Sequence, residues 1–300
     1  MFAALLAEHH TALALETATP VTSVTVDAAD AAAPFRVHTP RGVIRARHVI
    51  HATNGYSAAL VPGLRAKLFP VRGQMTAQRP GPAFPHHDGR RSWSVLRGRG
   101  LEYMTQVPRR DGGGGGGDLL LGGALAQSAQ NGLDEVGVAD DSTVNYEVGA
   151  HLAGALPLLF GPAAWGGDDA AAGTGVSHVD DMWTGIMGFT ADSLPFVGRL
   201  DASITGRPVP RAAAAAAGNR GPAPAEWIAA GYNGEGMVNA WLCGVAVALM
   251  ATGRDGDADF RPASGDGRPP GRVQDWLPRD YLVSPRRLAW ASVYELAARM

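Results

Sequence analysis

The chain has 300 residues, of which 46% are hydrophobic and 18% charged, and its formal net charge is −2. These values exclude the highly charged, weakly hydrophobic composition of disordered chains and the basic surface that non-specific nucleic-acid binding requires. The single cysteine, Cys243, excludes an intrachain disulfide and a cysteine-rich metal site. No basic segment opens the chain, and no run of about 18 residues is apolar throughout. We therefore expect a cytoplasmic globular protein with no nucleic-acid or membrane partner.

The first part of the chain predicts a short helix at the start, a small β-meander and one further strand. Alternating β-branched residues run from Thr19 to Ala46 and are broken by the turn at residues 40–42. The further strand, residues 49–52, runs into Thr53-Asn54-Gly55. Small residues at that strand end let another backbone or a ligand come close.

The middle of the chain predicts a mostly antiparallel sheet covered by one helix. Between residues 66 and 125 lie four strand candidates, LFPVRGQMTA, SWSVL, LEYMTQV and DLLLGGA. Apolar residues then recur at helical spacing from Val144 to Leu159, after N-cap oxygens at residues 140–142. The glycine run at residues 112–117 and the alanine run at 212–217 are interpreted as surface inserts without specific chemistry.

The strongest signal for a ligand site is a strand, a glycine-rich loop and a helix between residues 227 and 253. Gly231, Gly234 and Gly236 free the loop amides to approach a ligand. The helix at residues 237–252 points its positive dipole end at the same place, which favours an anionic or electron-rich group. The alternative is a glycine turn packed closely against a neighbouring strand. The spacing does not match G-x-G-x-x-G or a phosphate-binding loop with its lysine.

Four segments together resemble the FAD-dependent oxidoreductases of the D-amino acid oxidase, glycine oxidase and sarcosine oxidase superfamily. Their order and spacing agree with the family along residues 17–255. The segments are Thr19-Pro20-Val21, Ala52-Thr53-Asn54-Gly55-Tyr56, the stretch from Thr190 to Gly198 (TADSLPFVG) and the stretch from Ala229 to Met237 (AAGYNGEGM).

The resemblance implies an α+β fold made of two lobes. An incomplete FAD-binding lobe, of the glutathione-reductase-like Rossmann kind, would comprise residues 17–65 and 184–260. A mixed, mostly antiparallel sheet would form the substrate lobe at residues 66–183, followed by a C-terminal tail at 261–300. The family opens with a strand, a G-x-G-x-x-G turn and a helix that hold the FAD pyrophosphate. No such sequence precedes Thr19, so the chain resembles a truncated member that is expected to retain FAD poorly.

The resemblance also assigns cofactor contacts. Val21 would contact the adenine side of FAD through its backbone. The turn at Ala52, Thr53, Asn54 and Gly55 would line the cofactor. The loop would set backbone amides against the flavin pyrimidine through Gly231, Tyr232, Asn233, Gly234, Glu235, Gly236 and Met237. Sarcosine-oxidase-like relatives attach flavin through a cysteine near residues 184–189, and this stretch has none. We therefore expect non-covalent FAD.

Two residues are candidates for the substrate side, and no residue is assigned as catalytic. Tyr103, followed by Pro108-Arg109, resembles a substrate-fixing tyrosine of the family, although a buried core aromatic is the alternative. Arg72 could pair a substrate anion, although a surface arginine is the alternative. Amino-acid-oxidising relatives place an arginine where this chain has Met187 and Gly188, so a simple amino-acid carboxylate is not expected.

The sequence predicts no metal site, because its His and Asp residues lie next to one another in loops at 86–88 and 178–181. The implied function is FAD-dependent oxidation of a C–N bond in a small-molecule amine or secondary amino acid, with O₂ as acceptor. The alternative is a truncated, catalytically inactive remnant that acts as a binding or interaction module.

Overall fold

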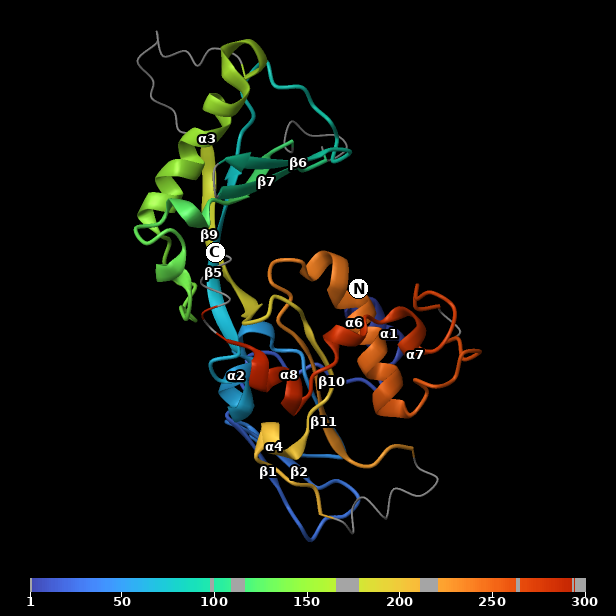
Figure 1. The fold of residues 1–300 in the computed structure, drawn as a ribbon. Coiled ribbons are helices and arrows are strands. Elements are labelled where there is room, and N and C mark those ends of the chain that lie inside the picture. Colours follow the sequence, from blue (N-terminus) through green and yellow to red (C-terminus); the bar gives the residue numbers. More distant parts are fainter. Residues whose placement is uncertain are drawn as a thin grey trace.

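The computed structural model describes residues 2–97, 100–108, 117–165, 178–210, 221–262, 265–292 and 294. Over these ranges the strands form three sheets (Figure 1). One pair of neighbouring strands is parallel, and the other pairs are antiparallel. The predicted α+β class with mostly antiparallel sheets is therefore confirmed. The alanine insert at 212–217, most of the glycine run at 112–117 and Arg109 lie outside the described residues.

The N-terminal part forms the predicted meander. Helix α1 (Phe2–Glu8) precedes it. Its three strands pair antiparallel in the order β1-β2-β3, namely β1 (Ser23–Val26), β2 (Phe35–Thr39) and β3 (Gly42–Ala46).

The second sheet brings together strands that lie far apart in the sequence. The strand order is β10-β11-β4, from β10 (Phe196–Arg199), β11 (Ala225–Ala230) and β4 (His48–His51). The β4–β11 pair is parallel and the β10–β11 pair antiparallel. Helix α6 (Gly236–Thr252) packs on one face, against Trp227 and Ala229. It ends at Gly253, whose φ of +70° forms the left-handed C-cap.

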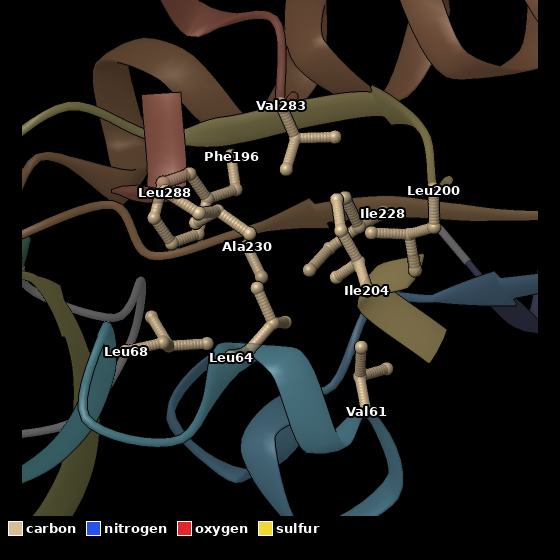
Figure 2. Close-up of a cluster of buried hydrophobic side chains, with 10 residues drawn as sticks. All are labelled: Val61, Leu64, Leu68, Phe196, Leu200, Ile204, Ile228, Ala230, Val283 and Leu288. Carbon is tan, nitrogen blue, oxygen red and sulfur yellow. The ribbon is translucent and has the colours of Figure 1, made fainter. Parts of the chain in front are cut away.

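The other face of this sheet contacts the short helices that follow β4 and β10: η1 (Asn54–Tyr56), α2 (Ser57–Leu60), η2 (Pro62–Leu64) and α4 (Ala202–Thr205). Figure 2 shows the apolar cluster between them, formed by Val61, Leu64, Leu68, Phe196, Leu200, Ile204, Ile228, Ala230, Val283 and Leu288. Because strand side chains alternate, Ile228 and Ala230 point into this cluster while their neighbours face α6.

A buried charged group joins β4 to β11 on the face of this cluster. His51 and Glu226 are buried, and His51 Nε2 lies 2.8 Å from Glu226 Oε2. Arg207 donates to both carboxylate oxygens, at 2.8 and 2.6 Å. Burial opposes ionisation of Glu226, but the hydrogen bonds from Arg207 and His51 hold its pKa below the usual value.

The sequence predicts a C-terminal tail at residues 261–300. Within it, residues 273–291 pack on this second sheet. They contain α7 (Val273–Trp276), η7 (Arg279–Tyr281) and α8 (Pro285–Trp290). Val273 joins the cluster under α6, and Leu288 joins the cluster of Figure 2. Arg287 forms a bidentate pair with Asp192, at 2.7 and 2.9 Å. This segment therefore stabilises the turn between β9 and β10.

The third sheet has five strands, all antiparallel, in the order β6-β7-β8-β5-β9. They are β5 (Leu68–Gln78), β6 (Ser92–Arg97), β7 (Gly100–Gln106), β8 (Leu119–Gly123) and β9 (Val179–Thr190). The four predicted strands between residues 66 and 125 correspond to β5 through β8. The long pair β5–β9 runs from the second sheet to the far end of the molecule (Figure 1).

Helix α3 (Tyr146–Trp165) covers one face of this sheet, as predicted. Its N-cap is Asn145, whose Oδ1 accepts from the amides of Glu147 and Val148, rather than residues 140–142. The helical geometry is interrupted at Gly161, whose φ is +68°. By length and composition α3 could cross a membrane; here Val148 and Leu152 pack against the sheet. Two short turns, η3 (Leu125–Gln127) and η4 (Leu133–Glu135), precede it.

Candidate functional site

The end of β4 lies against the ends of β9 and β11, and Asn54 connects the three. Asn54 adopts a left-handed φ of +43°, and its Oδ1 accepts a hydrogen bond from the amide of Gly231 at 2.9 Å. Any side chain in place of Gly188 would put its Cβ against the side-chain oxygen of Asn54. A Cβ in place of Gly55 would lie 2.6 Å from the carbonyl oxygen of Met187. These glycines are therefore required for close packing. The predicted turn at 52–55 and the predicted loop at 231–236 do lie together.

Asn233 fixes the loop onto β9. Its Oδ1 accepts from the amide of Thr190 at 2.8 Å, and its own amide donates to the Gly188 carbonyl at 2.8 Å. Its side-chain Nδ2 donates to the carbonyl of Gly231 at 2.7 Å. Gly231 has a φ of +79°, and a Cβ there would clash with Thr190. The base of the loop is thus the close-packed glycine turn that the sequence left open as an alternative.

The tip of the loop is different, because it is open. Gly234 is exposed with a φ of +86°, and no atom lies within 4 Å of the position where its Cβ would be. No side chain from the described residues caps α6, and Met237 in its first turn is fully exposed. The positive end of a 17-residue helix therefore faces open space. This arrangement fits the electron-rich edge of a flavin.

The remaining predicted cofactor residues differ in exposure. Val21 lies in the segment before β1 and is exposed, as are Ala52 and Thr53. Tyr232 packs its ring against the core under α6, and burial raises the pKa of its hydroxyl. The side chain of Tyr232 is thus partly buried. Glu235 is exposed and precedes the helix.

Cys243 lies in the core under α6. Its side chain is buried, and burial raises the pKa of the thiol to about 11. A thiol with so high a pKa is a poor nucleophile at neutral pH, because the reactive thiolate is scarce.

Tyr103 lies on the face of the five-stranded sheet opposite α3. It pairs with Gly122, which pairs with Met75, which in turn pairs with Trp183. Directly paired residues of antiparallel strands share a face, so these side chains form one row across four strands. A Cβ at Gly122 would lie 3.0 Å from the Tyr103 ring and would clash with the sulfur of Met75. Both side chains therefore cover Gly122.

A second methionine continues this row toward the loop. Met187 is on the same face, because it pairs with Val71 two residues before Gly73, and its methyl group lies 2.7 Å from the position of a Cβ at Gly73. We call Met75, Tyr103, Trp183 and Met187 the platform. Tyr103 is 42% exposed and Trp183 39% exposed. Partial burial raises the pKa of Tyr103, so its hydroxyl is protonated at neutral pH.

Arg72 lies on the other face, next to α3. Its guanidinium donates to both carboxylate oxygens of the buried Glu135, at 2.7 and 3.1 Å, and to Thr143 Oγ1 at 2.9 Å. The hydrogen bond to Glu135 raises the pKa of Arg72. The structure therefore does not bring the two predicted substrate residues, Arg72 and Tyr103, together. Among the described residues, no group of three His, Cys, Asp or Glu side chains could hold a metal ion.

Sequence reasoning missed Trp183, Met75 and Met187 as site candidates. The signal that could have found them is strand alternation. Met75 is two residues from Gly73, and Trp183 is four residues from Met187, so each pair shares a face. The local sequence does not show which face of the sheet is open, because that depends on the face against which α3 packs.

Comparison with known proteins identifies the family. The family model DAO, described as FAD dependent oxidoreductase, matches residues 2–250. The chain is similar in structure to glycine oxidase from Geobacillus kaustophilus, at 18% identity and a TM-score of 0.50, over 86% of this chain and 54% of that one. It is also similar to fructosyl amine:oxygen oxidoreductase (Amadoriase I) from Aspergillus fumigatus, at 12% identity and a TM-score of 0.53, over 90% and 49%. No curated protein matches the sequence.

At these identities the structural likeness shows the fold alone. The chain spans about half the length of both solved structures. The family model, in contrast, covers most of the chain, and it confirms the resemblance that the four sequence segments carry. The chain therefore belongs to the family of FAD dependent oxidoreductases.

Proposed function

We propose that this chain forms the flavin-facing and substrate-facing parts of an enzyme that oxidises a C–N bond of an amine, with O₂ as electron acceptor. The observation that carries the proposal is the open tip of the loop at residues 231–236. Gly234 has a positive φ and open space beside it, in front of an uncapped helix. A site of this kind stabilises negative charge, which reduced flavin carries near N1 and C2=O.

The residues that would hold FAD come from two segments. The amides of Gly234, Gly236 and Met237 would face the flavin pyrimidine, and the turn at residues 52–55 would line the cofactor, fixed beside the loop by the Asn54–Gly231 hydrogen bond. The parallel β4–β11 pair supports an incomplete Rossmann-type lobe. FAD would be held non-covalently, because Cys243 is buried and its thiol pKa is raised to about 11.

In the proposed reaction the amine loses a hydride from the carbon next to nitrogen and a proton from the nitrogen, which leaves an imine. FAD, when bound, would supply the redox chemistry: the hydride would go to the cofactor, and the two electrons and two protons taken from the amine would end on O₂ as hydrogen peroxide. The platform, whose polar hydrogen-bonding groups are the Tyr103 hydroxyl and the Trp183 indole N–H, would orient the amine. No strong base is needed when hydride leaves the carbon, so none is assigned.

A second candidate function is an inactive remnant that binds a partner without catalysis. The observation that favours it is that the loop between β11 and α6 reads G-x-x-G-x-G at residues 231–236 and so lacks the G-x-G-x-x-G spacing of a dinucleotide-binding turn. Such a turn holds the cofactor pyrophosphate in dinucleotide-binding folds. This candidate predicts no measurable FAD affinity.

Titration with FAD distinguishes the two. We expect purified material to be colourless and added FAD to bind weakly, as followed by the anisotropy of flavin fluorescence. Gly234→Val should abolish this binding without unfolding the protein, because valine resists a φ of +86° and occupies the open space. Gly206→Val is the matched control, because Gly206 also has a positive φ (+68°) and open surroundings, at the end of α4. The same FAD affinity in all three proteins would refute the loop as the flavin site.

A further inference from the structure

The surface beside the proposed flavin site is apolar and adaptable. The platform residues lie over a floor of glycines, with Met187 over Gly73 and with Met75 and Tyr103 over Gly122. At Gly185, paired with Gly73, nothing lies within 4 Å of a Cβ position. Methionine side chains adjust to an irregular ligand and make favourable contacts with aromatic rings. Such a surface is suited to a flat, apolar group.

The charges on this face decide which ligands it excludes. The residues that share the face, followed through the strand pairing, are Phe69, Val71, Gly73, Met75, Ala77, Ser92, Ser94, Leu96, Leu101, Tyr103, Thr105, Leu120, Gly122, Asp181, Trp183, Gly185, Met187 and Phe189. This described part of the face contains no lysine, arginine or histidine. Its one charged group is the carboxylate of Asp181, which pairs with Ala77.

A ligand carboxylate placed among these described residues would therefore have no cationic partner. Removing a carboxylate from water without an ion pair is costly, and Asp181 adds like-charge repulsion. Arg72, the cation that the sequence suggested, is held on the opposite face by Glu135. An ammonium group meets neither obstacle.

We propose that the platform binds the aromatic group of an arylalkylamine that carries no carboxylate. The inference deepens the proposed function and rests on it, because it names the class of amine that would be oxidised. The aromatic ring would lie against Trp183 and Met75, and the Tyr103 hydroxyl would remain free for one hydrogen bond. Aromatic contacts of this kind contribute through ring geometry as well as burial.

The test is calorimetric titration of the whole chain, with and without added FAD, using two probes. Benzylamine and racemic phenylglycine share the benzyl ammonium group and differ only by the carboxylate. We expect benzylamine to bind at least about tenfold more tightly, the factor that corresponds to one poorly compensated charged group. Equal affinity, tighter binding of phenylglycine, or no binding of benzylamine would overturn the proposal.

Variants locate the binding site. Trp183→Leu should weaken benzylamine binding by about threefold to tenfold, the range expected for one aromatic contact. Trp290→Leu is the control, because Trp290 is exposed in α8, whose Leu288 packs into the cluster of Figure 2. Met75→Arg should reverse the preference toward phenylglycine by supplying the missing cation. Unchanged benzylamine binding in Trp183→Leu, together with an unchanged preference in Met75→Arg, would contradict the assignment.

The inference and the proposed function fail in different ways. If benzylamine binds as expected but never reduces added FAD under anaerobic conditions, the platform assignment stands and the oxidase function is wrong. If phenylglycine reduces FAD while benzylamine does not bind, the oxidase function stands and the substrate class is wrong.

Discussion

The two faces of the five-stranded sheet are made of alternate residues of the same strands, and they differ in almost every property. On the face toward α3, polar side chains are buried and hydrogen-bonded: Gln74 Oε1 accepts from the Asn145 amide, and Gln78 Nε2 donates to the Leu152 carbonyl. Glu102 lies 2.6 Å from His151 of the helix. On the opposite face, Tyr103 and Trp183 remain partly exposed, and none of the helices in the described part of the chain covers them.

This difference separates stability from binding. On the face toward α3 the polar groups named above bond within the protein, and the burial of Leu121 and Leu152 stabilises the fold. At the exposed positions of the open face, such as Leu101, Tyr103 and Trp183, side chains contribute little burial, so they can be exchanged without unfolding the sheet. We expect substitutions on the two faces to have opposite profiles, with loss of stability on one and loss of binding on the other.

The largest effect is expected for Leu152→Ala, on the α3 face. Leu152 is fully buried between α3 and the sheet, so the cavity should lower the free energy of unfolding by about 2–5 kcal/mol. Leu101→Ala is the comparison on the open face. Leu101 is 49% exposed, and its loss should change stability by less than about 0.5 kcal/mol. Urea denaturation measures both, and equal losses would show that the two faces do not differ.

The next effect concerns two glycines of β9. A Cβ at Gly188 would clash with Asn54 Oδ1 and lie 2.9 Å from the amide of Gly55, whereas one at Gly185 would contact nothing. Gly188→Ala should therefore lower the unfolding free energy by about 1–3 kcal/mol through overpacking. Gly185→Ala should leave it within about 0.5 kcal/mol. Thermal or urea unfolding that cannot tell the two variants apart would rule out a tight junction at Asn54.

A further contribution should depend on pH, through Glu226. The pKa of Glu226 is lower in the folded protein than in the unfolded chain. Between the two pKa values, the folded protein therefore binds fewer protons at this residue than the unfolded chain does. The stabilisation is present above the unfolded pKa of about 4.3 and is lost as the pH falls through the lower folded value. Glu226→Gln should flatten this part of the stability profile. The exposed Glu147→Gln is the control, and a profile equally steep in all three proteins would refute the role of Glu226.

The smallest effect on stability is expected for Tyr103→Phe. The Tyr103 hydroxyl is on the open face, so its removal strands no buried partner and should change the melting temperature little. It should weaken the orientation of a bound amine and hence slow turnover, or the reduction of added FAD. Normal kinetics with a clearly lower melting temperature would instead identify Tyr103 as a core residue.

The sequence predicts the elements well where the signal is local. The meander, the strands of the large sheet and the strand-loop-helix at residues 225–252 follow from alternation, turn residues and the glycines around Gly234. The helix cap at Asn145 was missed, because residues 140–142 carry equally good capping oxygens.

The parts that could not be predicted depend on contacts between distant segments. Arg72 and Tyr103 are both plausible ligand-binding residues in the sequence, and only the position of α3 shows that they lie on opposite faces. Trp183 reaches Tyr103 through two intervening strands, which places them in one row only once the register is known. The loop is packed at Gly231 and open at Gly234. This difference could not be predicted either, because it depends on the position of the neighbouring strand β9.

The most direct test of the central claim is whether an amine on the open face acts on flavin at the loop. The measurement is the anaerobic change in the visible absorbance of added FAD when benzylamine is mixed with the chain. We predict bleaching of the flavin in the wild-type protein and in Trp290→Leu, slower bleaching in Trp183→Leu and none in Gly234→Val. Absorbance that stays unchanged in the wild-type protein, or bleaching that is equal in all four proteins, would contradict the account.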